Sequence, residues 1–157
     1  MLDQPYYEPG SQVTGNVYLR VTRTISGVKG IKFEMKGGGK NTFIRFYSEN
    51  VPDAEGNPHI ERREEKLKKS KKFLGYEQEF KGELPEELDG DYKLGFTFTL
   101  PDHIPSSLMF KDKKKKTKPS AKIKYFVKAK LMCRDDDMEM KHKAVMAVRE
   151  RAEEMKE

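Results

Sequence analysis

The segment Ala121-Lys122-Ile123-Lys124-Tyr125-Phe126-Val127-Lys128-Ala129-Lys130-Leu131 alternates between apolar side chains and, with the exception of Phe126, lysines. Successive side chains of a β-strand point to opposite faces, so a strand would turn the apolar set toward a core and the lysines toward water. On a helix the same lysines would scatter around the axis. The segment therefore predicts a β-strand with one buried face.

Other segments of the chain repeat this period of two. Residues 13–22 and 92–100 carry branched or aromatic side chains at most alternate positions. Weaker strand patterns cover three further segments: 28–36, 41–48 and 73–80. The segment 138–157 is ambiguous, because Met140 to Val148 alternate as a strand would, while Ala144, Val148, Ala152 and Met155 fall at helical spacing. We favour a last strand that ends near Arg149, followed by a polar end that frays or turns helical.

Segments rich in glycine and proline separate the expected strands. We expect Gly37-Gly38-Gly39 to form a turn that requires positive φ, between strands 28–36 and 41–48. The connection 49–72 has few apolar residues and is expected to be a charged hairpin extension or a mobile loop. Several strands joined by turns, with no clear helix between them, predict an all-β antiparallel sandwich or barrel and disfavour a parallel α/β fold, which needs crossover helices.

The positive charge of the chain is concentrated in two lysine tracts. The 157 residues carry a net charge of +6, and 37% of them are charged. Residues 66–72 and 111–118 contribute +5 each, so the rest of the chain carries −4. The tracts are almost pure lysine, without the interleaved aromatic side chains of many nucleic-acid sites, and this disfavours nucleic acid as a partner. The simplest alternative is that both tracts are solvated loops.

The sequence shows no motif for catalysis or for a cofactor. It has no Gly-x-Ser-x-Gly elbow, and the glycines before Lys40 do not match a phosphate-binding loop. The lone Cys133 is interpreted as structural, and the three histidines lie in separate segments. Asp135-Asp136-Asp137 is expected to be a solvated turn, with weak calcium binding as the alternative. We therefore expect a binding module that is not an enzyme and has no metal or cofactor.

Nothing in the sequence predicts export or a membrane span. No apolar stretch approaches the roughly 18 residues of a spanning helix, and the first five residues lack the pattern of a signal peptide. A single cysteine cannot form an internal disulfide, which fits a reducing compartment. These features favour a cytoplasmic protein.

Several phrases of the sequence, in the same order and with similar spacing, resemble the N-terminal domain of the arrestin family, nearest to α-arrestins and arrestin-domain-containing proteins. The phrases lie in five segments: Tyr7–Val17, Val28–Ile31, Tyr92–Pro101, Ile104–Ser107 and Ala121–Ala129. The resemblance covers about residues 6–149. It implies an immunoglobulin-like antiparallel β-sandwich over residues 1–149, followed by a polar tail, 150–157, that leads to a second domain outside this chain.

The resemblance also implies a function. Arrestin-like proteins are non-catalytic adaptors or scaffolds that bind cytoplasmic regions of membrane proteins in trafficking or signalling, so the chain is expected at membranes or endosomes. Two alternatives stay open. One is a β-sandwich that binds anionic lipid or nucleic acid through its lysine-rich segments; the other is a sorting protein like the retromer subunit of the same fold.

Under this hypothesis the lysine tracts are the candidate contacts. The first set, in the loop after the Pro-Ser-Ser phrase, would touch anionic phospholipid or phosphorylated tails: Lys111, Lys113, Lys114, Lys115, Lys116 and Lys118. The second set is Lys66, Lys68, Lys69, Lys71 and Lys72.

The sequence departs from the family pattern in two respects. Only Met1 to Tyr6 precede the Tyr-x-Pro-Gly phrase, where arrestins have a first strand with phosphate-sensing residues. A missing strand would leave a sheet edge open, so we expect a strand-exchanged dimer. No Pro-Pro-x-Tyr motif is present, so recruitment of a ubiquitin ligase is not expected from these residues.

Overall fold

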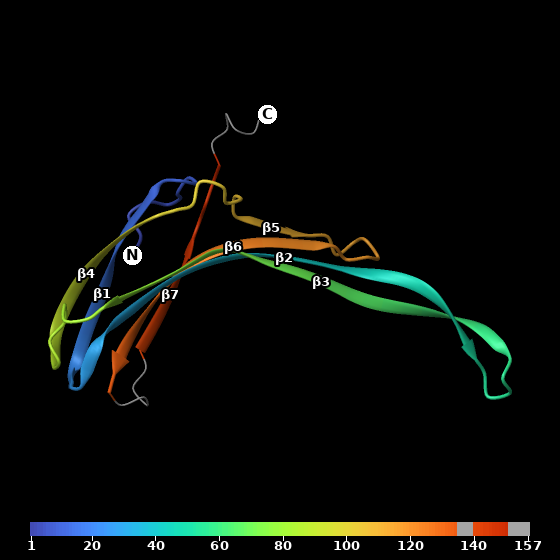
Figure 1. The fold of residues 1–157 in the computed structure, drawn as a ribbon, viewed down its shortest axis with the longest axis horizontal. Helices are drawn as coiled ribbons and strands as arrows, with labels where there is room; N and C mark the ends of the chain where they lie inside the picture. Colours follow the sequence, from blue (N-terminus) through green and yellow to red (C-terminus); the bar gives the residue numbers. More distant parts are fainter. Residues whose placement is uncertain (135–139, 151–157) are drawn as a thin grey trace.

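The computed structural model, which describes residues 1–134 and 140–150, consists of antiparallel strands in two sheets (Figure 1). The strands are β1 (Gln12–Ile25), β2 (Val28–Pro52), β3 (Pro58–Phe80), β4 (Leu88–Thr99), β5 (Leu108–Lys111), β6 (Ser120–Cys133) and β7 (Met140–Met146). The predicted all-β sandwich is thus confirmed.

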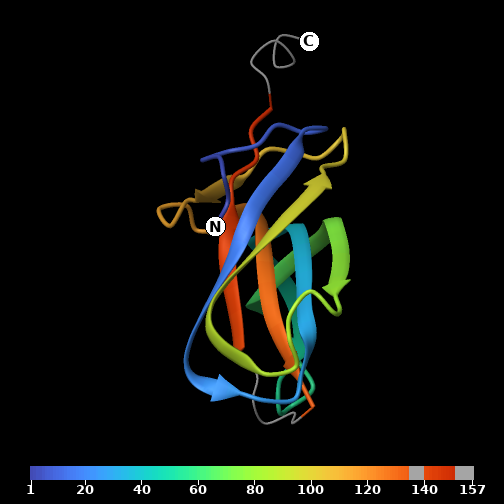
Figure 2. The same ribbon diagram turned by 90° about the vertical axis from the view of Figure 1, so that its left-hand side faces the viewer.

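One sheet is small and the other is large. β1 and β4 form a two-stranded sheet, whereas the larger sheet has the order β3-β2-β6-β5, with β7 also paired to β6. β5 and β7 follow one another along the same edge of β6, because β5 pairs with residues 120–123 and β7 with residues 125–131. Figure 2 shows β1 and β4 crossing in front of the larger sheet, and Figure 1 shows that they cover only one end of it.

Alternation along each strand builds the core between the sheets. Tyr125 and Val127 of β6 are buried, as predicted, together with Phe33 and Met35 of β2. The ring of Phe33 stacks on that of Phe96 from β4, with centroids 4.3 Å apart. Apolar burial and ring stacking therefore hold the two sheets together.

The structure corrects one prediction about β2 and β3 and decides between the two alternatives of another. Residues 28–52 form one strand, so Gly37-Gly38-Gly39 is not a turn between two strands, and none of these glycines has positive φ. The segment 49–72 is a hairpin extension and not a loop, since β2 and β3 pair from Ile31–Phe80 to Pro52–Pro58. The only turn between them covers residues 53–57, where the Asp53 carboxylate accepts hydrogen bonds from the amides of Glu55 and Asn57.

Close packing explains these glycines better than turn geometry does. A Cβ atom on Gly37 would lie 2.1 Å from a ring carbon of Tyr125, and one on Gly39 would lie 2.9 Å from the ring of Phe73. Real Cβ atoms do not approach other atoms this closely, so larger residues would displace the rings.

The N-terminal residues lie along β1. Leu2 forms a bridge with Gly15, the amide of Asn16 donates to the carbonyl of Met1 over 2.8 Å, and Tyr7 forms a parallel bridge with Val148. Within the described residues, the part of β1 after Asn16 has no strand partner besides β4. The strand-exchanged dimer remains a prediction for this edge.

The tail of the chain is only partly described. The last strand predicted before Arg149 is present as β7, which ends at Met146. Asp135-Asp136-Asp137, for which we expect a solvated turn or weak calcium binding, lies outside the described residues. So does most of the expected polar tail, 150–157.

Substituting Gly37 tests the packing explanation. We expect Gly37→Ala to lower the free energy of unfolding by about 1–3 kcal/mol, because the added methyl overpacks the ring of Tyr125. Gly95→Ala is the control, since its Cβ would approach only Asn16 Oδ1, at 3.6 Å. Chemical denaturation of both variants measures the difference, and equal stability of the two would contradict the explanation.

Tyr125 provides a second test. Its hydroxyl donates to the Pro105 carbonyl over 2.7 Å, and burial, with a smaller effect of Glu150, raises the pKa of Tyr125 to about 12. We expect Tyr125→Phe to cost about 1 kcal/mol of unfolding free energy near neutral pH. A raised pKa stabilises the folded state below the unfolded value near 10 and loses this effect as the pH rises toward 12. Denaturation curves should therefore show the advantage of the wild type shrinking over that range, and a constant difference would contradict this assignment.

Candidate anion-binding surface

The tract 66–72 lies in β3 and is divided between the two faces of the larger sheet. Lys68 pairs with Thr42 and Lys72 with Gly38, on the face turned away from β1 and β4, which we call the outer face. Lys69 and Lys71 lie on the opposite, inner face, where the Lys71 ammonium is 5.5 Å from the centre of the Phe73 ring. The expectation that this tract is a solvated loop was therefore wrong, although all of its lysines are exposed.

Lysines of two further strands join the outer face. Lys40 of β2 pairs with Lys122 of β6, and Gly38 pairs with Lys124. Because Tyr125 is buried in the core, the alternation places Lys122 and Lys124 on the outer face. We call the resulting set the outer lysine cluster: Lys40, Lys68, Lys72, Lys122 and Lys124.

The outer lysine cluster lacks neutralising carboxylates. In the described part of the chain, none of its five lysines forms an ion pair. Lys124 lowers the pKa of Lys122 through a side-chain contact and charge repulsion. The cluster therefore concentrates positive charge that the fold does not neutralise.

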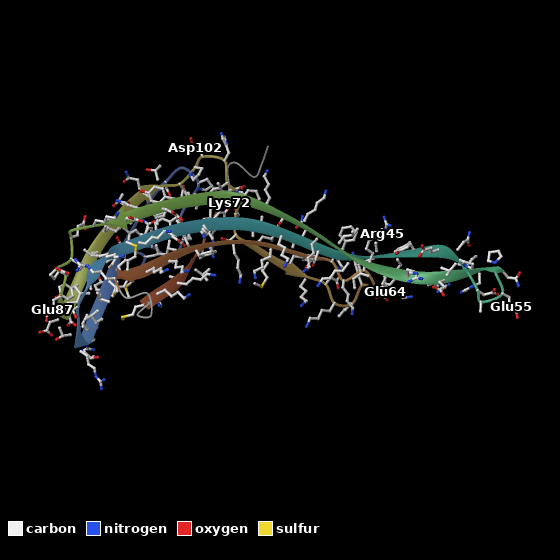
Figure 3. All side chains as sticks on the ribbon, turned by 60° about the horizontal axis from the view of Figure 1, so that its bottom comes forward. Arg45, Glu55, Glu64, Lys72, Glu87 and Asp102 are labelled. Atoms are coloured by element: carbon white, nitrogen blue, oxygen red, sulfur yellow. The ribbon has the colours of Figure 1, made fainter. Side chains whose placement is uncertain are left out.

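At both ends of the same sheet, by contrast, several cations form ion pairs with carboxylates. Nearer the sandwich, Lys32 lies 3.3 Å from Glu34 and Lys36 lies 3.6 Å from the same carboxylate. In the distal hairpin, Arg45 lies 3.4 Å from Glu65. Figure 3, which labels Lys72, Arg45 and Glu64, shows Lys72 over the middle of the sheet and the other two farther along the hairpin.

The loop with the second lysine tract folds against β2. The amide of Asp112 donates to the carbonyl of Pro119, and that of Lys118, which has φ of 43°, donates to Lys115. The amide of Ile44 donates to the Thr117 carbonyl over 2.7 Å, just beyond the last pair of β2 with β6, Thr42–Ser120.

Beyond the end of the β2–β6 pairing, this loop therefore lies along the edge of β2 that β6 occupies before it. Its six lysines, Lys111, Lys113, Lys114, Lys115, Lys116 and Lys118, are exposed. Since β3 lies on the other side of β2, the structure brings the two tracts to opposite sides of one strand.

The sequence analysis missed three members of the cluster, Lys40, Lys122 and Lys124. The alternation of residues 121–131 correctly predicted that Lys122 and Lys124 face water, while Lys128 and Lys130 are half-buried. It did not indicate their neighbours, because the register of β6 on β2 was unknown. To find these neighbours, the sequence analysis would have had to recognise residues 28–52 as one strand that contains Lys40.

The described residues contain no group of three or more side chains suited to a metal ion. Cys133 is buried within the core, in agreement with a structural role.

Comparison with protein families gives a match to the model described as "Arrestin (or S-antigen), N-terminal domain" over residues 2–152. The chain belongs to this family. No curated protein matches the sequence.

Among solved structures, the fold is similar to the sporulation control protein Spo0M from Bacillus subtilis. Sequence identity is 17% and the TM-score is 0.47, and the match covers 94% of this chain and 46% of that one. The arrestin-family domain thus spans about half the length of Spo0M. Within the described part of the chain, no helix is long and apolar enough to cross a membrane.

Proposed function

We propose that this arrestin-family domain is a non-catalytic adaptor that binds cytoplasmic regions of membrane proteins in trafficking or signalling. The family match over residues 2–152 is the observation that carries the proposal. Adaptor binding needs accessible surfaces for peptide segments, and the larger sheet has such a surface where β1 and β4 do not cover it.

The inner face of the larger sheet continues past the sandwich with exposed apolar side chains. Phe43 is 44% exposed and pairs with Leu67, while Phe110 is 50% exposed and pairs with Ala121. Lys69 lies on the same face, opposite Asn41. We call Phe43, Leu67, Leu108 and Phe110 the inner platform.

The inner platform suits a peptide that combines apolar and acidic residues. Its large side chains offer apolar area that water now covers, and the neighbouring lysines attract carboxylates or phosphates. Cytoplasmic loops and tails of membrane proteins include segments of this composition. We therefore assign tail binding to the inner platform.

An array of peptides tests the adaptor function. The peptides come from the cytoplasmic loops and tails of membrane proteins encoded in the source genome, and the labelled domain is applied at rising concentration. We expect saturable binding to a subset of native peptides and none to their scrambled versions. Equal binding to native and scrambled peptides would contradict the proposal.

Two variants then locate the site. Phe43→Ala with Phe110→Ala should weaken binding about tenfold or more, as for central apolar residues of an interface. Tyr18→Ala removes an aromatic side chain that is 57% exposed on β1, outside the inner platform, and should leave binding unchanged. Equal loss in both variants would contradict the assignment to the platform.

A further inference from the structure

The outer lysine cluster combines charges from three neighbouring strands on one face of the larger sheet. Lys68 and Lys72 come from β3, Lys40 from β2, and Lys122 and Lys124 from β6. Neighbouring strands lie about 4.8 Å apart, and residues two apart on one strand are separated by roughly 6.6 Å. The positive charges of the cluster therefore extend both along and across the strands and form a two-dimensional patch.

The fold keeps these charges close together without relieving their repulsion. Lys122 and Lys124 contact each other, which lowers the pKa of Lys122. No described carboxylate forms an ion pair with a lysine of the cluster. Nearer the sandwich, by contrast, Glu34 forms ion pairs with Lys32 and Lys36. An anion from outside the protein would supply the missing negative charge.

The side chains of the cluster favour a surface of phosphate groups over a ligand with defined geometry. All five are lysines, which act as hydrated point charges, and none is an arginine, which would bind one phosphate with two parallel hydrogen bonds. All five are exposed, so they present charge outward and do not enclose a ligand.

An apolar side chain accompanies the cluster on the same face. Met109 of β5 pairs with Lys122 and is 72% exposed. Lysines beside an exposed apolar side chain are typical of protein surfaces that lie on membranes, where the apolar group enters the interface and the lysines bind headgroups. Nucleic acid would be favoured by free aromatic rings for stacking. The aromatic residue beside the cluster on this face, Phe126, is partly buried, and the Lys143 ammonium lies 3.9 Å from the centre of its ring.

We propose that the outer lysine cluster docks this domain on membranes that contain anionic phospholipids. The inference goes beyond the adaptor function and does not rest on it. It also names a surface other than the inner platform, so lipid and peptide can bind on opposite faces of the same sheet.

Vesicle co-sedimentation of two charge-matched variants tests the proposal. The cluster variant carries Lys40→Gln, Lys68→Gln, Lys122→Gln and Lys124→Gln. The loop variant carries glutamine in place of Lys113, Lys114, Lys115 and Lys116 and loses the same charge. The vesicles contain phosphatidylcholine with or without phosphatidylserine.

We expect wild type to bind only the vesicles that contain phosphatidylserine, and more weakly as salt rises. Each lysine near an anionic surface contributes a factor of about five, so the cluster variant should bind at least tenfold more weakly. The loop variant should lose less than the cluster variant. Equal losses would show that net charge alone governs binding and would overturn the proposal, as would a larger loss in the loop variant.

Two further measurements keep the result interpretable. Circular dichroism and thermal unfolding establish that both variants fold. If the cluster variant unfolds, the smaller variant Lys122→Gln with Lys124→Gln replaces it and is compared with Lys113→Gln with Lys114→Gln, which loses the same charge. Tighter binding of duplex DNA or of a phosphorylated peptide than of vesicles, at the same salt concentration, would overturn the lipid assignment. Peptide binding through the inner platform is measured separately, so failure of vesicle binding leaves the adaptor function standing.

Discussion

Residues 31–42 of β2 are paired on both edges, with β3 on one side and β6 on the other, and the rest of the larger sheet depends on this double ladder. Gly37 permits it, because Tyr125 of β6 lies where its Cβ would be. Tyr125 in turn holds the loop that contains Pro105 through its hydroxyl. A side chain at Gly37 would force either the ring or the strand away, so one small residue controls the alignment of the three strands.

The double ladder also determines where charge lies. Pairing in register brings Lys40 beside Lys122 and places Lys68 and Lys72 on the same face, although these residues come from distant parts of the sequence. The hairpin continues past the end of β6, where the loop 111–118 takes its place through the bond from Ile44 to Thr117. The inner platform results from the same geometry, because β1 and β4 end before the large sheet does.

Local sequence patterns correctly predicted features that a single strand determines, such as which of its side chains are buried. The alternation of residues 121–131 correctly indicated a strand with Tyr125 buried and Lys122 and Lys124 exposed, and the arrestin resemblance indicated the sandwich. Three consecutive glycines were misinterpreted, because a glycine required by a nearby ring has the same local signature as one required by a turn. The outer lysine cluster could not be predicted, since it depends on the register between strands, which no single segment encodes.

NMR of the segment from Gly37 to Asn41 tests the central claim most directly. If β2 is a continuous strand paired on both edges, the amides of this segment should exchange slowly with solvent, and nuclear Overhauser effects should connect Lys40 with Lys122 on one side and with Ser70 on the other. Rapid exchange of these amides, together with contacts between residues 36 and 40 typical of a turn, would contradict the account.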